Sequence, residues 1–326
     1  MLRRDFIRAG IATWGSALLA RPAFSQAYPA GPVTVILPLQ AGSASDVAVR
    51  DAVTEMATRM NANFVVENVA AAAGVVGLER FSRVKPDGQT IAGFNNSILT
   101  ILPHLQPKHV KIDTRTAFLP IAGIANIPTF FAVPGDSPIK SIKDLIEACR
   151  KHPKHITYSS GAVGSPQHLA MEMFSSITGV KLLHVPYRGA SAAALAVAAH
   201  EVDVMSMALS LAKPFMGDGR VRLIGYCGLE RHPQYPDIPT LDEQGVPGYE
   251  YSSWISLFAQ KNAPPDIVAL LRKEAGIVTN DPALQKQLLH AGLDPWPKTP
   301  EQLAKIIKDD YKKWQKIVKD AHIQQA

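Results

Sequence analysis

Short polar turns between strand patterns and helix patterns hold the residues of this chain that could bind a ligand. The first turn follows the strand pattern Val33–Leu39 and reads QAGSASD from Gln40. Small residues let an anion approach the unpaired N–H groups and the positive dipole end of the following helix. We interpret Gly42, Ser43 and Ser45 as a candidate carboxylate or phosphate cradle. A plain helix cap, in which the serines satisfy only their own helix, remains the alternative.

Three later turns repeat this chemistry after other strand patterns. The candidate ligand contacts there are Asn95, Asn96 and Ser97 in one turn, Ser160, Gly164, Ser165, Gln167 and His168 in the next, and Tyr187, Arg188 and Gly189 in the last. Arg188 could pair with a carboxylate or be solvated. His168 could touch the ligand or lie beside the apolar stripe that follows it. Leu39 and Gln40 at the edge of the first turn, with Ser206 on a later strand pattern, complete the candidate set.

Asp46 is an unexpected neighbour for a bound anion, because two carboxylates repel each other. At the first helical turn it can accept backbone N–H bonds and interact favourably with the helix dipole. It could instead bind a ligand ammonium group. The two interpretations imply different ligands, an acid without an amine or an amino acid, and the residues of the turn leave both open.

Strand patterns alternate with helix patterns through most of the chain, which indicates an α/β protein with largely parallel sheets. The strand patterns are Val33–Leu39, Phe64–Val69, Thr90–Phe94, Phe130–Val133, Ile156–Ser159, Leu182–Pro186, Val202–Met207 and Val221–Cys227. Helix starts are indicated by the capping box from Ser141, by Ser165 before Pro166 and by Thr299 before Pro300. The tail from Pro265 is almost entirely helical in pattern, and its lysines alternate with a buried stripe. A solvated basic face is the preferred interpretation, a membrane-surface helix the alternative.

Two extended segments, Ile121–Pro134 and Tyr249–Gln260, are expected to cross between two lobes. We therefore predict a discontinuous first lobe of residues 28–125 and 251–326, and an inserted second lobe of residues 126–250. A cleft between such lobes is a common place for a ligand.

The first 27 residues have the composition of a signal peptide, with cleavage expected near Ala27. The RRDFIR stretch resembles a twin-arginine export motif, although an ordinary secretory signal stays open. Of the formal net charge of +6, this segment supplies +3 through four arginines and one aspartate. The remaining charge is too small to indicate nucleic-acid binding.

No motif for catalysis, a metal or a cofactor stands out along the chain. The GAVGS stretch is neither a nucleophile elbow nor a phosphate loop. Cys149 and Cys227 are the only cysteines, and no histidine set lies near them, which argues against a zinc site. Cys149 has the helical spacing of a buried hydrophobic residue, and a disulfide between the two stays open. We expect no cofactor and no enzymatic activity.

Several blocks of the sequence, taken in order, resemble one protein family. The blocks YPAGPVTVILPLQAGSASDVAVR, ITYSSGAVGSPQHLAMEMF and LLHVPYRGASAAALAVAAHEVDVM are three of them. They resemble the Bug-type periplasmic binding proteins, the solute receptors of tripartite tricarboxylate transporters. This resemblance implies a two-lobed type II binding-protein fold and a small, usually carboxylated ligand held by turns of both lobes. The matching positions are Gly42, Ser43, Ser45 and Asp46, then Gly164, Ser165 and the stretch from Tyr187 to Gly189.

The first turn departs from the family pattern at two positions, so the ligand's identity does not carry over. The family usually has two consecutive glycines where this chain has Gly42 and Ser43, and Gln40 replaces a small or apolar residue. The expected function is a monomeric periplasmic receptor that delivers an organic carboxylate to membrane permease subunits. A ligand-sensing subunit for a membrane kinase and an exported enzyme are the alternatives.

Overall fold

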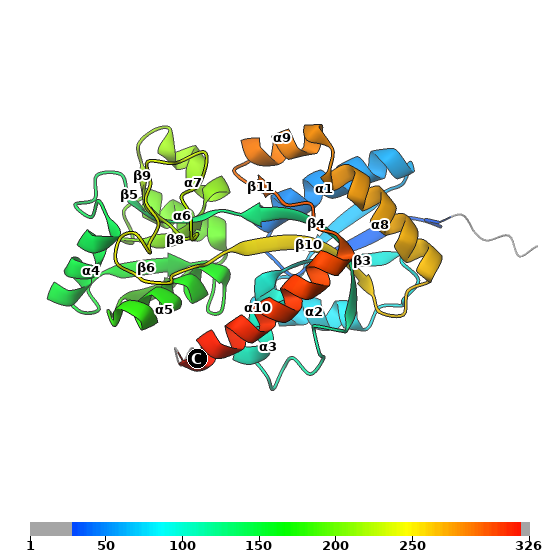
Figure 1. Ribbon diagram of the computed structural model, residues 1–326, viewed down its shortest axis with the longest axis horizontal. Coiled ribbons are helices and arrows are strands. Elements are labelled where there is room, and N and C mark those ends of the chain that lie inside the picture. Colours follow the sequence, from blue (N-terminus) through cyan, green and yellow to red (C-terminus); the bar gives the residue numbers. More distant parts are fainter. Residues whose placement is uncertain (1–27, 321–326) are drawn as a thin grey trace, which may run out of the picture.

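The computed structural model describes residues 28–320 and shows two α/β lobes joined by long strands (Figure 1). Residues 1–27, on which the signal-peptide prediction rests, lie outside the described residues, as do residues 321–326. The strands are β1 (Val33–Leu37), β2 (Phe64–Asn68), β3 (Thr90–Asn95), β4 (Phe118–Ile127), β5 (Thr129–Pro134), β6 (Thr157–Ser160), β7 (Leu183–Pro186), β8 (Met205–Ala208), β9 (Val221–Tyr226), β10 (Ser253–Gln260) and β11 (Asp294–Pro295). The helices are α1 (Ala44–Met60), α2 (Val75–Ser82), α3 (Leu102–Leu105), α4 (Ile142–Lys151), α5 (Pro166–Thr178), α6 (Ala190–Ala198), α7 (Leu209–Met216), α8 (Pro265–Thr279), α9 (Pro282–His290) and α10 (Pro300–Asp320).

The first lobe is built on a mixed sheet of strand order β11-β4-β10-β3-β1-β2. Strands β2 and β3 both pair parallel with β1, as the alternating strand and helix patterns predict. Strand β10 pairs antiparallel with both β3 and β4, and β11 pairs antiparallel with β4. The sheet therefore combines β1 to β4 with β10 and β11, which come from a distant part of the chain.

The second lobe contains an antiparallel sheet of order β8-β5-β9 and a parallel pair, β6 and β7. The two are joined by a bridge between Tyr158 and Val204. The Ser159 N–H donates to the Val204 carbonyl at 3.1 Å, and the Val204 N–H donates to the Thr157 carbonyl at 3.2 Å. These bonds place β7, β6 and the β8 end of the antiparallel sheet side by side.

The expectation of largely parallel sheets is wrong for the centre of each lobe. The two extended segments predicted as crossings include β4, β5 and β10, and the chain passes through them in opposite directions. Strand β10 must therefore run antiparallel to β4, and β5 enters the second lobe against β8 and β9. The lobe boundaries predicted at residues 125/126 and 250/251 lie in these crossing segments and stay predictions.

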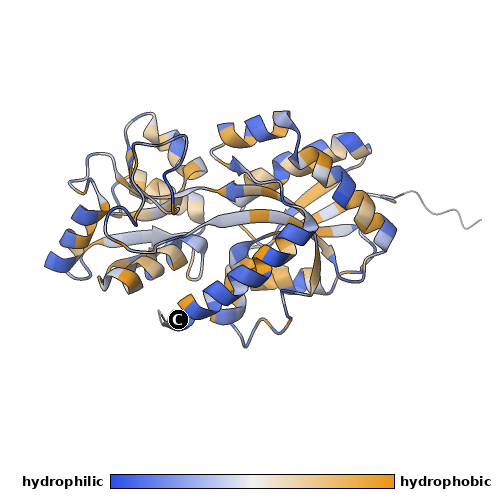
Figure 2. Cartoon of the chain, in the orientation of Figure 1, coloured by the Kyte–Doolittle hydropathy of each residue, from blue (hydrophilic) through white to orange (hydrophobic). Residues whose placement is uncertain are grey.

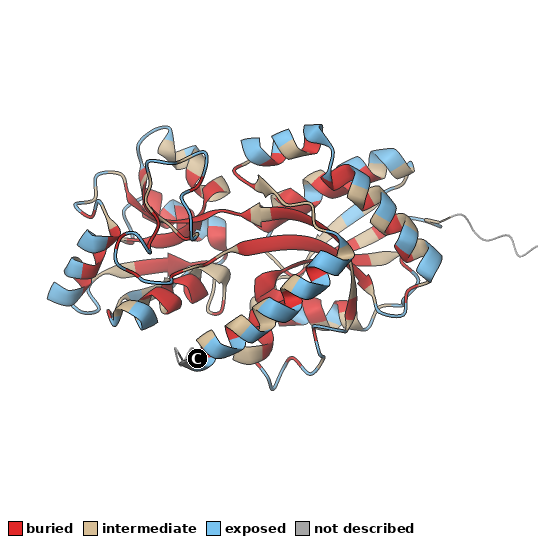
Figure 3. Ribbon diagram, viewed as in Figure 1, coloured by how far each residue is buried: buried red, intermediate tan, exposed pale blue. Residues whose placement is uncertain are grey.

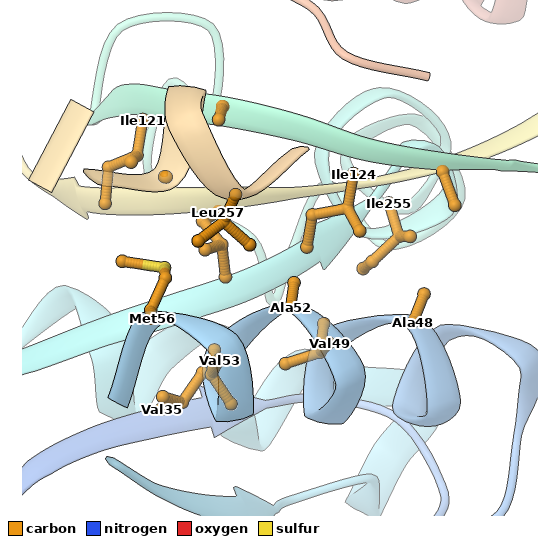
Figure 4. Close-up of a cluster of buried hydrophobic side chains, with 14 of the residues drawn as sticks. Val35, Ala48, Val49, Ala52, Val53, Met56, Ile121, Ile124, Ile255 and Leu257 are labelled. Carbon is orange, nitrogen blue, oxygen red and sulfur yellow. The ribbon is translucent and has the colours of Figure 1, made fainter. Parts of the chain in front are cut away.

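Helix α1 is fixed by its buried face, which packs on strands β4 and β10 (Figure 4). Val49, Val53, Met56 and Met60 recur at helical spacing, and the first three are buried while Met60 is partly buried. Each buried aliphatic side chain of this kind contributes roughly 1.5–3 kcal/mol. This packing holds the first turn of α1 close to the carboxyl end of β1.

Helix α10 spans both lobes along one side of the molecule (Figure 1). It begins with the predicted Thr299–Pro300 signature, and the Thr299 Oγ1 accepts the Gln302 N–H at 3.3 Å. Ile307 packs in a first-lobe core, whereas Trp314 and Val318 pack in the second-lobe core. Its other face is hydrophilic and exposed, as predicted for the lysines of this tail (Figures 2 and 3).

Both cysteines are buried and free, so the disulfide that the sequence left open is not formed. Cys149 lies on the buried face of α4, as its helical spacing predicts. Among residues 28–320, no helix is both long enough and apolar enough to cross a membrane. Nor does this part of the chain bring together three or more His, Cys, Asp or Glu side chains that could hold a metal ion.

Candidate functional site

A cavity between the lobes collects residues from both sheets and both crossing segments. Its empty space is about 860 Å³, including the open solvent at its mouth. The residues that line it are Pro38, Leu39, Gln40, Ser43, Ala44, Ser45, Ala70, Ala73, Asn95, Ser97, Ile127, Thr129, Gly161, Ala162, Gly164, Ser165, Pro166, Gln167, Gly189, Ala190, Ser206, Ala208, Leu211, Tyr251 and Ser253. We call it the interlobe cavity.

The amino ends of four helices meet at this cavity. The first turn of α1 contributes Ser43, Ala44 and Ser45, and the start of α5 contributes Ser165, Pro166 and Gln167. Helix α6 begins at the wall with Gly189 and Ala190, and α7 with Ala208. Each helix start carries a partial positive charge and unpaired N–H groups. Among the described residues, no charged side chain lines the cavity. The wall is therefore weakly positive without carrying a formal charge.

The first turn combines a helix cap with a glycine in a left-handed conformation. Gly42 has φ +73°, which glycine adopts without strain, and the turn closes through a Ser43 N–H bond to the Gln40 carbonyl at 3.2 Å. The Ser43 hydroxyl accepts the Asp46 N–H at 3.3 Å and so caps α1. The cap interpretation is therefore satisfied, and Ser43 still borders the cavity.

Asp46 lies behind the turn and is fully engaged there. Its carboxylate accepts the Gly42 N–H at 2.9 Å, Arg50 Nε at 3.0 Å and Asn68 Nδ2 at 2.8 Å. Burial raises the pKa of this carboxyl group, but the bonds from Arg50, Asn68 and Gly42, together with the Arg50 charge, outweigh burial and lower the pKa. Asp46 does not line the cavity, and its carboxylate holds the turn through these bonds.

The two asparagines of the second turn have different roles. The Asn95 side-chain oxygen accepts the Ser97 hydroxyl at 2.8 Å and the Ile98 N–H at 3.2 Å, and both Asn95 and Ser97 line the cavity. Asn96 instead ties the start of β10 to the first lobe. It donates to the Ser252 carbonyl at 2.8 Å and accepts the Ser253 hydroxyl at 3.0 Å. Its side-chain amide is used for architecture, away from the cavity wall.

The loop from Gly161 to Ser165 forms the second-lobe side of the cavity. Gly161 leaves no room for a side chain, since a Cβ there would lie 2.7 Å from the Ala190 nitrogen. Ser165 caps α5 by accepting the His168 N–H at 3.5 Å. Two predicted contacts, Ser160 and His168, lie under this loop and form hydrogen bonds within it rather than lining the cavity.

Tyr187 and Arg188 also lie away from the cavity wall. The Tyr187 hydroxyl donates to Glu201 at 3.2 Å, and Arg188 is exposed. Gly189 does reach the wall, in a left-handed conformation with φ +112°, and packs against Gln40 of the other lobe. Nearby, the Ser191 hydroxyl donates to the Gly42 carbonyl at 3.3 Å. The turns of the two lobes therefore touch across the rim of the cavity.

Of the predicted residues, the structure brings eleven to the cavity wall and leaves seven off it. Those at the wall are Leu39, Gln40, Ser43, Ser45, Asn95, Ser97, Gly164, Ser165, Gln167, Gly189 and Ser206. Those off it are Gly42, Asp46, Asn96, Ser160, His168, Tyr187 and Arg188. Five of the six side chains among these residues form hydrogen bonds to the backbone or to neighbouring side chains.

Tyr251 is a wall residue that sequence reasoning missed, and its buried hydroxyl distinguishes it from the other missed residues. It is 2% exposed, and its hydroxyl has no hydrogen-bond partner in the described part of the chain. Burial, with a smaller effect of Cys227, raises its pKa, so the phenol stays protonated and can donate. The available signal was its position in the crossing segment Tyr249–Gln260, which also supplies Ser253 to the wall.

Comparison with known proteins identifies the family of this chain. Residues 48–323 match the model of the tripartite tricarboxylate transporter family receptors. The chain belongs to this family. It is 31% identical to the "UPF0065 protein in tcbD-tcbE intergenic region" of Pseudomonas sp. strain P51, covering 97% of this chain and 94% of that one.

Two solved structures extend the match to three dimensions. The periplasmic binding protein BugD shares 28% identity with a TM-score of 0.85, over 92% of this chain and 100% of that one. The R. palustris protein Rpa4515, solved with adipate, shares 27% identity with a TM-score of 0.85, over 91% and 99%. The resemblance to Bug-type receptors and the two-lobed type II binding-protein fold are both confirmed. This family member is a solute-binding receptor.

Proposed function

We propose that this receptor captures a small organic carboxylate in the periplasm and delivers it to the membrane permease of a tripartite transporter. The observation that carries the proposal is the meeting of four helix amino ends at a cavity wall without charged side chains. In such a site, backbone N–H groups and helix dipoles bind an anion without a formal cation. The adipate bound by Rpa4515 is an acid of this kind.

The ligand we propose is an acid without an amino group. An ammonium would need a carboxylate partner, and Asp46 is already bonded to Gly42, Arg50 and Asn68. The positive ends of the helices would also repel it. The apolar part of the wall, from Leu39, Ile127 and Leu211, suits a short hydrocarbon body between polar ends.

The proposed ligand contacts are the eleven predicted residues at the wall together with Tyr251 and Ser253. The protonated Tyr251 phenol is suited to donate to a carboxylate. The contacts at the rim, between Gln40 and Gly189 and between Ser191 and Gly42, join the two lobes. We expect these contacts to hold the lobes closed around the ligand. A smaller radius of gyration with saturating ligand, measured by X-ray scattering, is the expected signature of closure.

A thermal-shift series with matched acids tests the ligand class. Adipate, hexanoate and 2-aminoadipate differ by one carboxylate or one ammonium. A true ligand raises the melting temperature in proportion to the logarithm of its concentration once binding saturates. We expect adipate-like acids to stabilise the protein and 2-aminoadipate to do so less. The proposal would be contradicted if only the amino acid stabilised the protein, or if no acid in a wider panel of carboxylates did so.

A further inference from the structure

A cluster of ionisable side chains lies directly beneath the loop from Gly161 to Ser165, and the ligand site as described does not use it. The cluster consists of Tyr158 on β6, His168 and Glu172 on α5, and His184 on β7. Four residues of the loop above it line the interlobe cavity: Gly161, Ala162, Gly164 and Ser165. Any group that fixes the shape of this loop therefore acts on the ligand site.

His168 holds the loop through its backbone. The Gly164 N–H donates to His168 Nδ1 at 3.1 Å, and Gly164 has φ +78°, a conformation that glycine favours. A nitrogen that accepts this bond carries no proton. The other ring nitrogen, Nε2, then carries the proton and lies 3.9 Å from a Glu172 oxygen. The loop geometry thus requires His168 in one neutral tautomer.

His184 holds the same loop through Ser160. The Ser160 hydroxyl donates to the Ala162 carbonyl at 2.9 Å, and His184 Nε2 lies 2.6 Å from the same hydroxyl oxygen. Because the single proton of Ser160 is used on Ala162, His184 Nε2 must be the donor. The resulting chain of bonds runs from His184 through Ser160 to a residue of the cavity wall.

The two rings are stacked and buried, and their burial disfavours a positive charge on either. Their centroids lie 4.4 Å apart with an interplanar angle of 23°, and Tyr158 stacks on His184 at 4.7 Å. The Tyr158 hydroxyl donates to a Glu172 carboxylate oxygen at 2.6 Å. This is the same oxygen that lies 3.9 Å from His168 Nε2. Burial lowers the pKa of His168 to about 4. Burial and the neighbouring His168 lower the pKa of His184 to about 4, against an opposing effect of Glu172.

We propose that His168 and His184 are positioning residues for the ligand site: His168 in its neutral form and His184 through its Nε2–H donor fix the Gly161–Ser165 loop in its ligand-binding shape. The proposal rests on the proposed function for its effect on affinity. Its effect on the loop can be measured without any ligand. A loop that only partly occupies the binding shape would reduce the apparent affinity by the same fraction.

The ligand-free test follows the Gly164 amide by NMR in protein labelled with ¹⁵N-glycine. In the unaltered protein, this signal should shift as the pH falls from 7.5 to 3.5, with a midpoint near the pKa of His168, about 4. His168→Asn offers an acceptor oxygen that does not titrate, so its Gly164 signal should shift much less than that of the unaltered protein over this range. His168→Leu should displace the signal already at pH 7.5. His200→Asn, at an exposed histidine of the same lobe, is the matched control and should behave as the unaltered protein.

The affinity test uses adipate as the probe at pH 7.5. We expect His168→Leu to weaken binding roughly tenfold or more, because it leaves the Gly164 N–H without an acceptor, and His168→Asn to restore most of the loss. A Gly164 signal that ignores pH, or that titrates equally in His168→Asn, would overturn the proposal. Absence of adipate binding in the unaltered protein would exclude adipate as a ligand, and the NMR titration would still decide the role of the histidines.

Discussion

Replacing Tyr251 with phenylalanine should change stability and ligand affinity in opposite directions. The Tyr251 hydroxyl is buried without a hydrogen-bond partner in the described structure, and a buried unpaired hydroxyl costs about 1–3 kcal/mol. Its removal should leave the free energy of unfolding unchanged or raise it by about 1 kcal/mol. Phenylalanine also keeps the edge-to-face ring contact with Trp314, whose centroid lies 5.6 Å away. The ligand-free protein thus loses no interaction.

The same substitution should weaken ligand binding substantially. A hydrogen bond from a neutral donor to a carboxylate contributes about 1.5–3 kcal/mol, which corresponds to roughly a ten- to hundredfold change in Kd. Isothermal calorimetry with the acid that gives the largest thermal shift measures the affinity. Urea unfolding of the ligand-free protein measures the stability.

Tyr249→Phe is a matched control only two residues away. The Tyr249 hydroxyl is fully buried, donates to the Ala170 carbonyl at 2.9 Å and does not line the cavity. Its loss should lower the free energy of unfolding by about 1 kcal/mol and leave Kd within about twofold. If Tyr251→Phe instead lowers stability and leaves Kd unchanged, the inference that this hydroxyl donates to the ligand is refuted.

Three further outcomes follow from the site geometry. Asp46→Asn should lower the free energy of unfolding by about 2 kcal/mol in urea melts, because an amide cannot accept all the donors now bonded to the carboxylate. The loss is limited because Arg50 is half-exposed and its charge is screened by water. A large loss of affinity at unchanged stability would show instead that Asp46 meets the ligand. Ser165→Ala should lower the free energy of unfolding by about 1 kcal/mol, because the helix cap is lost. If the hydroxyl also contacts the acid, calorimetry should show weaker ligand binding as well. Unchanged affinity would remove Ser165 from the site. The folded-state pKa of His168 is depressed from 6.5 to about 4, so between these pH values the unfolded chain binds more protons than the folded protein. The contribution of His168 to the free energy of unfolding should therefore fall by about 2 kcal/mol from pH 7 to pH 5. Urea melts of His168→Asn at both pH values should lack this part of the change.

Local sequence rules were sufficient for the elements and their first turns. All eight predicted strand patterns correspond to strands, and Ser141, Ser165 and Thr299 all accept the backbone N–H bonds expected of helix caps. Each cap bond joins residues three positions apart, and each strand pattern is one continuous run of the chain. The backbone geometry of caps and turns is set at short range, so the sequence determined where these three helices begin.

Which side chains face the ligand cavity was decided only by the tertiary structure. Asp46 could not be assigned from its own turn, because its partner Asn68 lies on another strand. Tyr251 reaches the cavity because β10 returns from the second lobe to the first, next to β3 and β4. That return also made the sheets mixed where the alternating pattern predicted parallel pairing. Strand and helix periods report what each segment buries, whereas the orientation and neighbours of a side chain in a cleft depend on how distant segments cross.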